Sequence, residues 1–162
     1  METIHVLKDW INAAAEATND FAAQALGVEQ SIATCGIEII DEPSCSDLEG
    51  SCLQLTCGET SIKVCFLSGE DILMKIARIM LAISSEDELS KKDMIDAIKE
   101  AINIISGGIK RRLNEQFIGG ITLGLPLFMK REFMNEEHEN RVIAKIVVAE
   151  MPVFLIAISN SG

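Results

Sequence analysis

The chain has 162 residues, and its 25 acidic against 14 basic side chains give a formal net charge of −11 at pH 7. This length fits one domain, and we expect a single domain over residues 1–162 with a core of its own. With 48% hydrophobic residues, the chain does not belong to the disordered class. Its acidity excludes nucleic acids and anionic membrane surfaces as partners, because both attract clustered Lys and Arg.

No segment of the sequence predicts export or membrane insertion. The chain does not open on a basic stretch followed by an apolar run, which is the pattern of a signal peptide. Its most apolar stretch, residues 142–158, contains Lys145, Glu150 and Pro152, whereas a spanning helix needs about 20 nearly uncharged residues. We therefore expect a cytoplasmic protein without membrane contact.

The cysteines do not form the paired motif of a structural metal site. They are Cys35, Cys45, Cys52, Cys57 and Cys65. A metal site would require some of these thiolates to converge with His5 or His138. The alternative, which we favour, is free thiols that act as small apolar residues in a reducing compartment. We therefore expect no metal centre.

The chain begins with an amphipathic helical pattern. Apolar residues recur at helical spacing over residues 4–26, and Gly27 is the expected end of this helix. Residues 31–40 are compatible with a strand. The polar residues 41–50 predict a loop.

A change of the hydrophobic period to two then predicts a β-hairpin. Residues 53–57 and 62–66 each place alternate apolar side chains on one face, on either side of a short turn. A capping box from Ser68 to Asp71 predicts the start of a second helix. Its expected core-facing residues are Ile72, Ile76, Ile79, Met80 and Ile83.

The second half of the chain combines one long helix with strands. A second capping box at Ser90 opens the longest helical pattern, which extends to about Leu113. Strands are predicted at 121–125, ending at Pro126, at 142–149 and at 153–158, with a charged loop or hairpin at 129–140. We therefore expect an α+β fold, a two-layer sandwich with a mostly antiparallel sheet and helices packed on one face.

The long helix has two distinct faces. Its core-facing residues are Ile95, Ile98, Ile102, Ile105, Ile109 and Leu113. Within about 40° of one line on the other side lie Asp96, Glu100, Asn103, Gly107 and Lys110. An ordinary solvated face is one interpretation of this second set. The other is an insertion surface, because Asn103 and Gly107 are poor helix formers and Gly107 leaves the backbone open to close approach.

These residues form a spaced motif. Asp96-x3-Glu100-x2-Asn103-x22-Pro126 is similar to the Asp/Ser-x3-Glu-x2-Asn-x22-Pro signature of the CheC, CheX and FliY chemotaxis phosphatases. The order of predicted elements resembles the single-motif CheX layout over nearly the whole chain. The resemblance therefore implies one CheX-like domain.

The resemblance also implies a function. In that family the substrate is a phosphorylated CheY-type response regulator, whose aspartyl phosphate is hydrolysed. By position, Asn103 would orient the attacking water and Glu100 would pair with the active-site lysine of the receiver. The receiver supplies Mg²⁺ and a lysine, so we expect no cofactor on this chain.

Four further residues are expected to support docking. Asp96 either adjusts the local charge or caps the helix. Pro126 shapes the surface beside the motif helix. Gly107 permits close approach, and Lys110 opens a short basic run that either holds an acidic receiver or favours the helix C-terminus.

The first helix carries its own Glu16-x2-Asn19 pair, which we interpret as a solvated face and not as a second site. The resemblance to CheX-type proteins also favours a homodimer through sheet edges. The apolar strands at 142–158 would be exposed edges in a monomer.

Two alternatives to the phosphatase are a receiver-binding module of the same fold without catalysis and a thiol sensor. The sensor would use Cys52, Cys57 and Cys65, with the hairpin bringing Cys57 near Cys65.

Overall fold

The computed structural model describes residues 2–28, 38–40, 47–130 and 140–159. In chain order, its elements are α1 (Glu2–Ala25), β1 (Glu38–Ile40), β2 (Glu49–Cys57), β3 (Thr60–Ser68), α3 (Glu70–Met80), α4 (Lys91–Leu113), the 3-10 turn η1 (Asn114–Gln116), β4 (Thr122–Leu123), β5 (Leu127–Lys130), β6 (Asn140–Val148) and β7 (Met151–Ser159). The helices predicted at 4–26 and from Ser90 to Leu113 are confirmed. Gly27 has a φ of +66°, which suits the end of α1.

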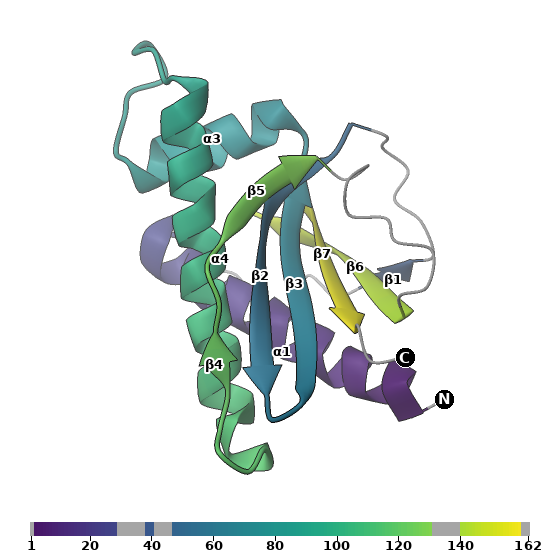
Figure 1. Cartoon of the computed structure of the whole chain (residues 1–162). Helices are drawn as coiled ribbons and strands as arrows, with labels where there is room; N and C mark the ends of the chain where they lie inside the picture. Colours follow the sequence, from purple (N-terminus) through teal and green to yellow (C-terminus); the bar gives the residue numbers. More distant parts are fainter. Residues whose placement is uncertain (1, 29–37, 41–46, 131–139, 160–162) are drawn as a thin grey trace.

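The described strands form one seven-stranded sheet in the order β1-β6-β7-β3-β2-β4, with β5 also pairing with β2. Every pairing is antiparallel. Helices α1 and α4 lie on one face of this sheet, α1 across β6 and β7 and α4 along β2 (Figure 1). The α+β sandwich with helices on one face is therefore confirmed.

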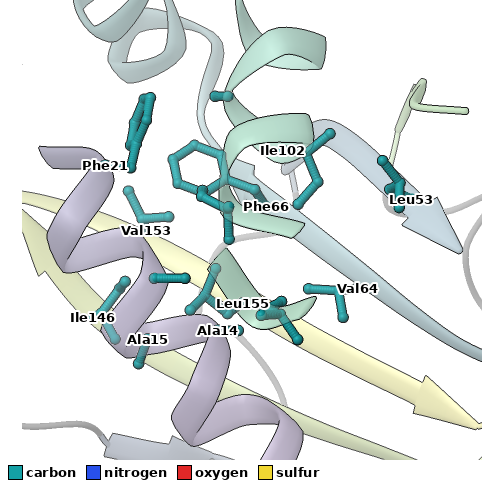
Figure 2. Packing of buried hydrophobic residues seen from close by; sticks show 14 of the residues in the cluster. Ala14, Ala15, Phe21, Leu53, Val64, Phe66, Ile102, Ile146, Val153 and Leu155 are labelled. Atoms are coloured by element: carbon teal, nitrogen blue, oxygen red, sulfur yellow. The ribbon is translucent and has the colours of Figure 1, made fainter. Parts of the chain in front are cut away.

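The main core lies between these two helices and the sheet. Figure 2 shows Ala14 and Phe21 of α1 and Ile102 of α4 pointing toward Phe66 and Leu155 of the sheet. The rings of Phe21 and Phe66 meet edge to face, with centroids 6.4 Å apart. The buried residues of α4 include Ile98, Ile102, Ile105, Ile109 and Leu113. The isoleucine face predicted from the helical spacing is thus the face that the sheet covers.

The start of α4 is attached to the sheet and to α3. The Ser90 hydroxyl accepts a hydrogen bond from the Asp93 amide at 3.1 Å, so the predicted cap is confirmed. Lys91 Nζ lies 2.5 Å from Glu49 Oε1 on β2 and 3.2 Å from Glu70 Oε2 on α3. Desolvation lowers the pKa of Lys91, but its bonds to these two carboxylates outweigh that effect, and the pKa is raised.

The capping box predicted at Ser68 is wrong. Ser68 is the last residue of β3, and its hydroxyl donates to the carbonyl of Pro152 at 2.8 Å instead of capping a helix. The N-cap of α3 is Gly69, without a side-chain bond. Ile79 was expected to face the core, but it is exposed near the end of α3. The buried residues of this helix are Leu73, Ile76 and Ala77.

Gly50 was assigned to a loop but lies inside strand β2. A Cβ at this position would lie 1.9 Å from the carbonyl oxygen of Phe66 on the neighbouring strand β3. The glycine therefore permits close approach of the β2 and β3 backbones. The Asp, Glu and Ser residues around it in the sequence had favoured a loop. The hairpin itself is confirmed and is longer than predicted at both strands, with the turn at Gly58 and Glu59.

The strand predicted at 121–125 is shorter than expected, and a strand after Pro126 was missed. Only Thr122 and Leu123 pair with β2 as strand β4, and β5 then pairs with the other end of β2. Between them, the Gly124 amide donates to the Gln54 carbonyl at 2.7 Å. Pro126, which has no N–H, therefore separates two short edge strands that share one partner.

The hairpin does not bring Cys57 near Cys65. Cys65 lies directly opposite Cys52, whereas Cys57 pairs with Thr60. Cys57 belongs to the core under the helices, and Cys52 and Cys65 belong to a second buried cluster. Burial raises the pKa of the Cys57 thiol, which lowers its thiolate fraction and speaks against a reactive sensor.

The strands at the end of the chain are not the sheet edges on which the homodimer prediction rested. β7 lies between β3 and β6, and β1 covers the outer side of β6. Among the described strands, the edges are β1 on one side and β4 with β5 on the other. That argument is therefore wrong, while the homodimer itself stays a prediction.

Some expectations fall outside the described residues. These are the strand over residues 31–37, the loop over 41–46, the charged segment 131–139, and Cys35, Cys45 and His138. In the described part of the chain, no helix is long and apolar enough to span a membrane.

Two adjacent glycines of α4 provide a test of the helix packing. A Cβ on Gly108 would lie 2.8 Å from Ala17 Cβ of α1, whereas one on Gly107 would meet only Arg111 Nη1 at 3.8 Å. We expect Gly108→Ala to lower the free energy of unfolding by about 1–3 kcal/mol through overpacking. Gly107→Ala should raise it by up to about 1 kcal/mol through helix propensity. Urea denaturation measures both, and equal effects would contradict this packing.

Candidate functional site

The motif residues lie on the side of α4 that faces away from the core. Asp96, Glu100, Asn103 and Lys110 are exposed, and Gly107 is half-buried. Glu100 and Asn103 are one helical turn apart, which places their Cβ atoms about 5–6 Å from each other. The spacing predicted this common face, and the structure confirms it. The helix therefore presents a carboxylate beside an amide to the outside.

Glu100 and Asn103 have no binding partner within the part of the chain that the structure describes. Neither side chain makes a hydrogen bond there, and Glu100 makes no ion pair there. Their functional groups are therefore available to a second molecule. An amide can both donate to and accept from a water, and a carboxylate can pair with an ammonium group.

Asp96 differs from these two residues because it is already paired. Its carboxylate lies 3.0 Å from Lys92 Nζ, one turn earlier on the same helix. The hydrogen bond to Asp96 raises the pKa of Lys92. Both side chains are largely exposed, so the pair contributes little to stability and mainly reduces the negative charge at this end of the face.

Basic side chains border the site. Lys99 and Lys110 lie close to Asn103 on the helix surface, and Arg111 lies next to Lys110. None of the three has a carboxylate within ion-pair distance among the described residues. The protein has a net charge of −11, yet this face offers unpaired positive charge.

Arg112, the last residue of the basic run, has a different role because it faces α1. Its guanidinium bonds to the carboxylates of Glu16 at 3.2 Å and of Asp20. The hydrogen bond to Asp20 raises the pKa of Arg112. Glu16 is therefore held by an ion pair across the two helices.

The Glu16 and Asn19 pair on α1 is thus not equivalent to the pair on α4. Glu16 is bound by Arg112, and the amide oxygen of Asn19 is buried without a hydrogen-bond partner. Neither group is free to enter another protein's active site. This geometry agrees with the interpretation that the pair is not a second site. The face is not simply solvated, because Glu16 is exposed but ion-paired and Asn19 is partly buried.

Pro126 lies between β4 and β5, two strands that both contact α4. The segment that contains it begins near the C-terminal end of α4, where the Ile121 amide donates to Asn114 Oδ1 at 2.8 Å. It ends near the N-terminal end, where Lys91 Nζ lies 5.7 Å from the centre of the Phe128 ring. β4 and β5 follow the length of the helix between these points (Figure 1). The motif proline is therefore brought to the motif helix by the pairing of β4 and β5 with β2.

One pocket lies apart from this face, at the N-terminal end of α3. It encloses about 600 Å³ and is lined by Asp47, Leu48, Glu49, Gly69, Glu70, Asp71 and Lys130. Despite these carboxylates, the described residues contain no group of three or more His, Cys, Asp or Glu side chains arranged to hold a metal ion. The pocket holds none of the motif residues.

The chain matches the model of one protein family, chemotaxis phosphatase CheX, over residues 51–147. Among solved structures, it is similar to the chemotaxis protein CheX of Vibrio vulnificus, with 15% identity over 93% of this chain and 99% of that chain and a TM-score of 0.70. The CheX of Desulfovibrio desulfuricans gives 13% identity over 91% and 97% of the two chains, with a TM-score of 0.69.

A third similar structure is the complex of CheX with CheY, BeF₃ and Mg²⁺ from Borrelia burgdorferi. It shows 14% identity over 93% of this chain and 96% of that chain, with a TM-score of 0.64. At these identities the structural similarity establishes the fold. No curated protein sequence gives a significant match.

The contacts of Arg112 predict a measurable link between α1 and α4. Arg112→Ala removes its bonds to Glu16 and Asp20. All three side chains are partly exposed, so we expect the free energy of unfolding to fall by about 1 kcal/mol at low salt. Because salt screens such pairs, the loss should shrink in 0.5 M NaCl, about three times the physiological ionic strength. Urea denaturation at both salt concentrations measures this, and a loss independent of salt would contradict an electrostatic link.

Proposed function

Because the chain belongs to the CheX family of chemotaxis phosphatases, we propose that it hydrolyses the aspartyl phosphate of a CheY-type response regulator. The observation that carries this proposal is the Glu100 and Asn103 pair, exposed and without a partner in the described structure. The matched region, residues 51–147, contains the whole motif from Asp96 to Pro126. The complex of the Borrelia burgdorferi relative with CheY supports a receiver as the partner.

The proposed hydrolysis requires this chain to position the attacking water and does not require a nucleophile from it. A water oxygen forms a bond to phosphorus while the bond from phosphorus to the aspartyl oxygen breaks. The products are inorganic phosphate and the free Asp carboxylate of the receiver, and the protons of the water pass to phosphate and solvent. Phosphoryl transfer depends mainly on positioning and charge stabilisation. The receiver brings Mg²⁺ and a lysine, so this chain contributes an oriented amide and no cofactor.

Asn103 acts in the chemical step, and Glu100 acts in docking. The Asn103 amide accepts a hydrogen bond from the attacking water and holds it in line with the phosphorus. The Glu100 carboxylate pairs with the lysine of the receiver one helical turn away and fixes the depth of insertion. A rigid helix, packed along its full inner face, is a suitable carrier for such a pair.

Gly107, Lys110, Asp96 and Pro126 support this docking. Gly107 leaves the helix surface low next to Asn103, and its neighbourhood does not require a glycine for packing. Lys110 supplies unpaired positive charge toward a phosphorylated, acidic partner. Asp96 is bound to Lys92 and acts only on the local charge. Pro126 shapes the surface beside the helix.

The proposed activity places the protein in the cytoplasm, together with its receiver, and a homodimer stays a prediction. A non-catalytic receiver-binding module is the alternative of the same fold. Catalytic turnover distinguishes the two, because only a phosphatase releases more phosphate than one equivalent per protein molecule.

The first test measures release of inorganic phosphate from a phosphorylated CheY-type receiver with substoichiometric protein. We expect Asn103→Ala to lower kcat by about 100-fold, because removing a positioned group typically costs that much. The matched control is Asn19→Ala, which changes the same residue type at the same spacing on α1 and should leave kcat unchanged. Acceleration by wild type that survives in Asn103→Ala would contradict the mechanism. Binding of the receiver without faster hydrolysis of its phosphate would support the alternative, a receiver-binding module without catalysis.

Glu100 should act on binding more than on the chemical step. We expect Glu100→Gln to raise KM about tenfold or more and to change kcat less, because the charge-assisted pair with the receiver lysine is lost. Steady-state kinetics over a range of receiver concentrations separates the two parameters. Glu16→Gln is the control, and a drop confined to kcat in Glu100→Gln would assign Glu100 to the chemistry instead.

Gly107 should limit how close a partner can approach. Gly107→Leu places a branched side chain one turn from Asn103, and we expect it to weaken receiver binding at least tenfold. Gly107→Ala is the smaller matched change and should have a milder effect. Titration with a receiver carrying beryllofluoride and Mg²⁺ measures both, and equal affinity in Gly107→Leu would exclude close approach at this point.

A further inference from the structure

The side chain of Arg111 is folded back along α4 toward the motif residues. Its Nη1 atom lies 3.8 Å from the position that a Cβ on Gly107 would occupy, one helical turn before the backbone of Arg111 itself. Long side chains of a helix point toward its N-terminus, and the missing side chain of Gly107 gives the guanidinium room to lie close to the helix. The guanidinium is therefore found one turn from Asn103.

The Asn103 amide lies between two groups of opposite charge. Glu100 precedes Asn103 by about 4.5 Å along the helix axis, and Gly107, which lies under the Arg111 guanidinium, follows it by about 6 Å. Neither charged group has a hydrogen-bond or ion-pair partner among the described residues. Both side chains are exposed. The outward face of α4 thus offers a carboxylate, an amide and a guanidinium in this order.

The next residue, Arg112, shows by contrast that Arg111 is not needed for packing. Arg112 faces α1 and bonds to the carboxylates of Glu16 and Asp20. Arg111 makes neither bond, so the contact between α1 and α4 does not require it. A cation near the C-terminal end of a helix also favours the helix dipole, but that effect does not depend on the guanidinium lying over Gly107.

From this placement we infer that Arg111 contacts the phosphoryl group of the receiver and makes binding selective for the phosphorylated form. This inference rests on the proposed function, because it takes the same partner and the same role of Asn103. If the Asn103 amide holds a water against the phosphorus, the phosphoryl group lies about two hydrogen-bond lengths, roughly 6 Å, from the amide. The guanidinium over Gly107 lies at a comparable distance, on the side of Asn103 opposite Glu100.

The charges of this face favour a phosphoryl group as the partner of Arg111. Glu100 attracts a cation of the receiver, whereas Arg111 attracts an anion, and the phosphoryl group is the anion that distinguishes the two forms of a receiver. A guanidinium forms paired hydrogen bonds with phosphate oxygens, whereas the ammonium groups of Lys99 and Lys110 are point charges. Because the whole chain carries a net charge of −11, an anionic group gains from positive charge at the place where it docks.

The test compares wild type with Arg111→Met, which keeps an unbranched side chain and removes the charge. One titration uses a CheY-type receiver carrying Mg²⁺ and beryllofluoride, which replaces the phosphoryl group, and the other uses the same receiver with Mg²⁺ alone. We expect Kd for the loaded receiver to rise about tenfold or more and Kd for the unloaded receiver to change less than about twofold. KM for hydrolysis of the phosphorylated receiver should rise in parallel. Because Arg111 is exposed and unpaired in the described structure, the unfolding midpoint should not change.

Two further variants serve as controls. Arg111→Lys keeps the charge without the planar pair of donors and should recover only part of the selectivity. Full recovery would overturn a directional contact of the guanidinium. Lys75 is exposed on α3 and has no ion pair among the described residues, so Lys75→Met removes one positive charge from another helix and should leave both Kd values unchanged. A loss equal to that of Arg111→Met would overturn the inference, because it would show a general effect of net charge.

The outcomes separate this inference from the proposed function. If wild type prefers the loaded receiver without accelerating hydrolysis and Arg111→Met loses that preference, the phosphatase proposal fails and the role of Arg111 stands. If wild type hydrolyses the phosphate and Arg111→Met keeps the preference, the role of Arg111 is wrong and the phosphatase stands. Equal weakening of the loaded and unloaded receivers overturns the inference, because it would place the guanidinium against an acidic side chain. Failure of wild type to prefer the loaded receiver overturns it as well.

Discussion

The orientation of the candidate site depends on how one face of α4 is buried against the sheet and α1. A stripe of isoleucines packs against β2 and the core, and Gly108 allows α1 to approach to the point where a Cβ would overlap Ala17. Because this burial fixes the rotation of the helix about its axis, it also fixes which residues face outward. Rotation by one residue position, about 100°, would bury Asn103 and expose Ile102 or Ile104. The same packing that stabilises the core therefore orients Glu100 and Asn103.

Polar contacts at both ends of α4 prevent the helix from sliding along the surface of β2 and α1 against which it packs. At its start, the Ser90 cap and the bonds of Lys91 connect the helix to β2 and α3. At its end, Asn114 accepts from the backbone of Ile121, at the start of the segment that leads to Pro126. The motif helix and the motif proline are thus joined through this contact and through β2, which pairs with both β4 and β5.

Two Glu-x2-Asn pairs with the same spacing differ because of one arginine. Arg112 binds Glu16 on α1, while no such cation reaches Glu100 on α4 in the described structure. A carboxylate that already forms an ion pair would have to break it before pairing with another lysine, whereas a solvated one loses only water. Spacing alone does not distinguish these pairs, because it says nothing of which side chain from another element lies opposite.

The sequence by itself determined what depends on local periodicity and on fixed spacings. The two long helices, the hairpin, the Ser90 cap and the outward face of α4 all follow from patterns within about 25 residues, and the motif spacing indicated the family. Tertiary structure decided the rest, because it depends on contacts between distant segments. Gly50 resembles a loop residue until the carbonyl of Phe66 lies against it. Ser68 resembles a helix cap until Pro152 accepts its hydrogen bond, and β5 exists because β2 offers it an edge.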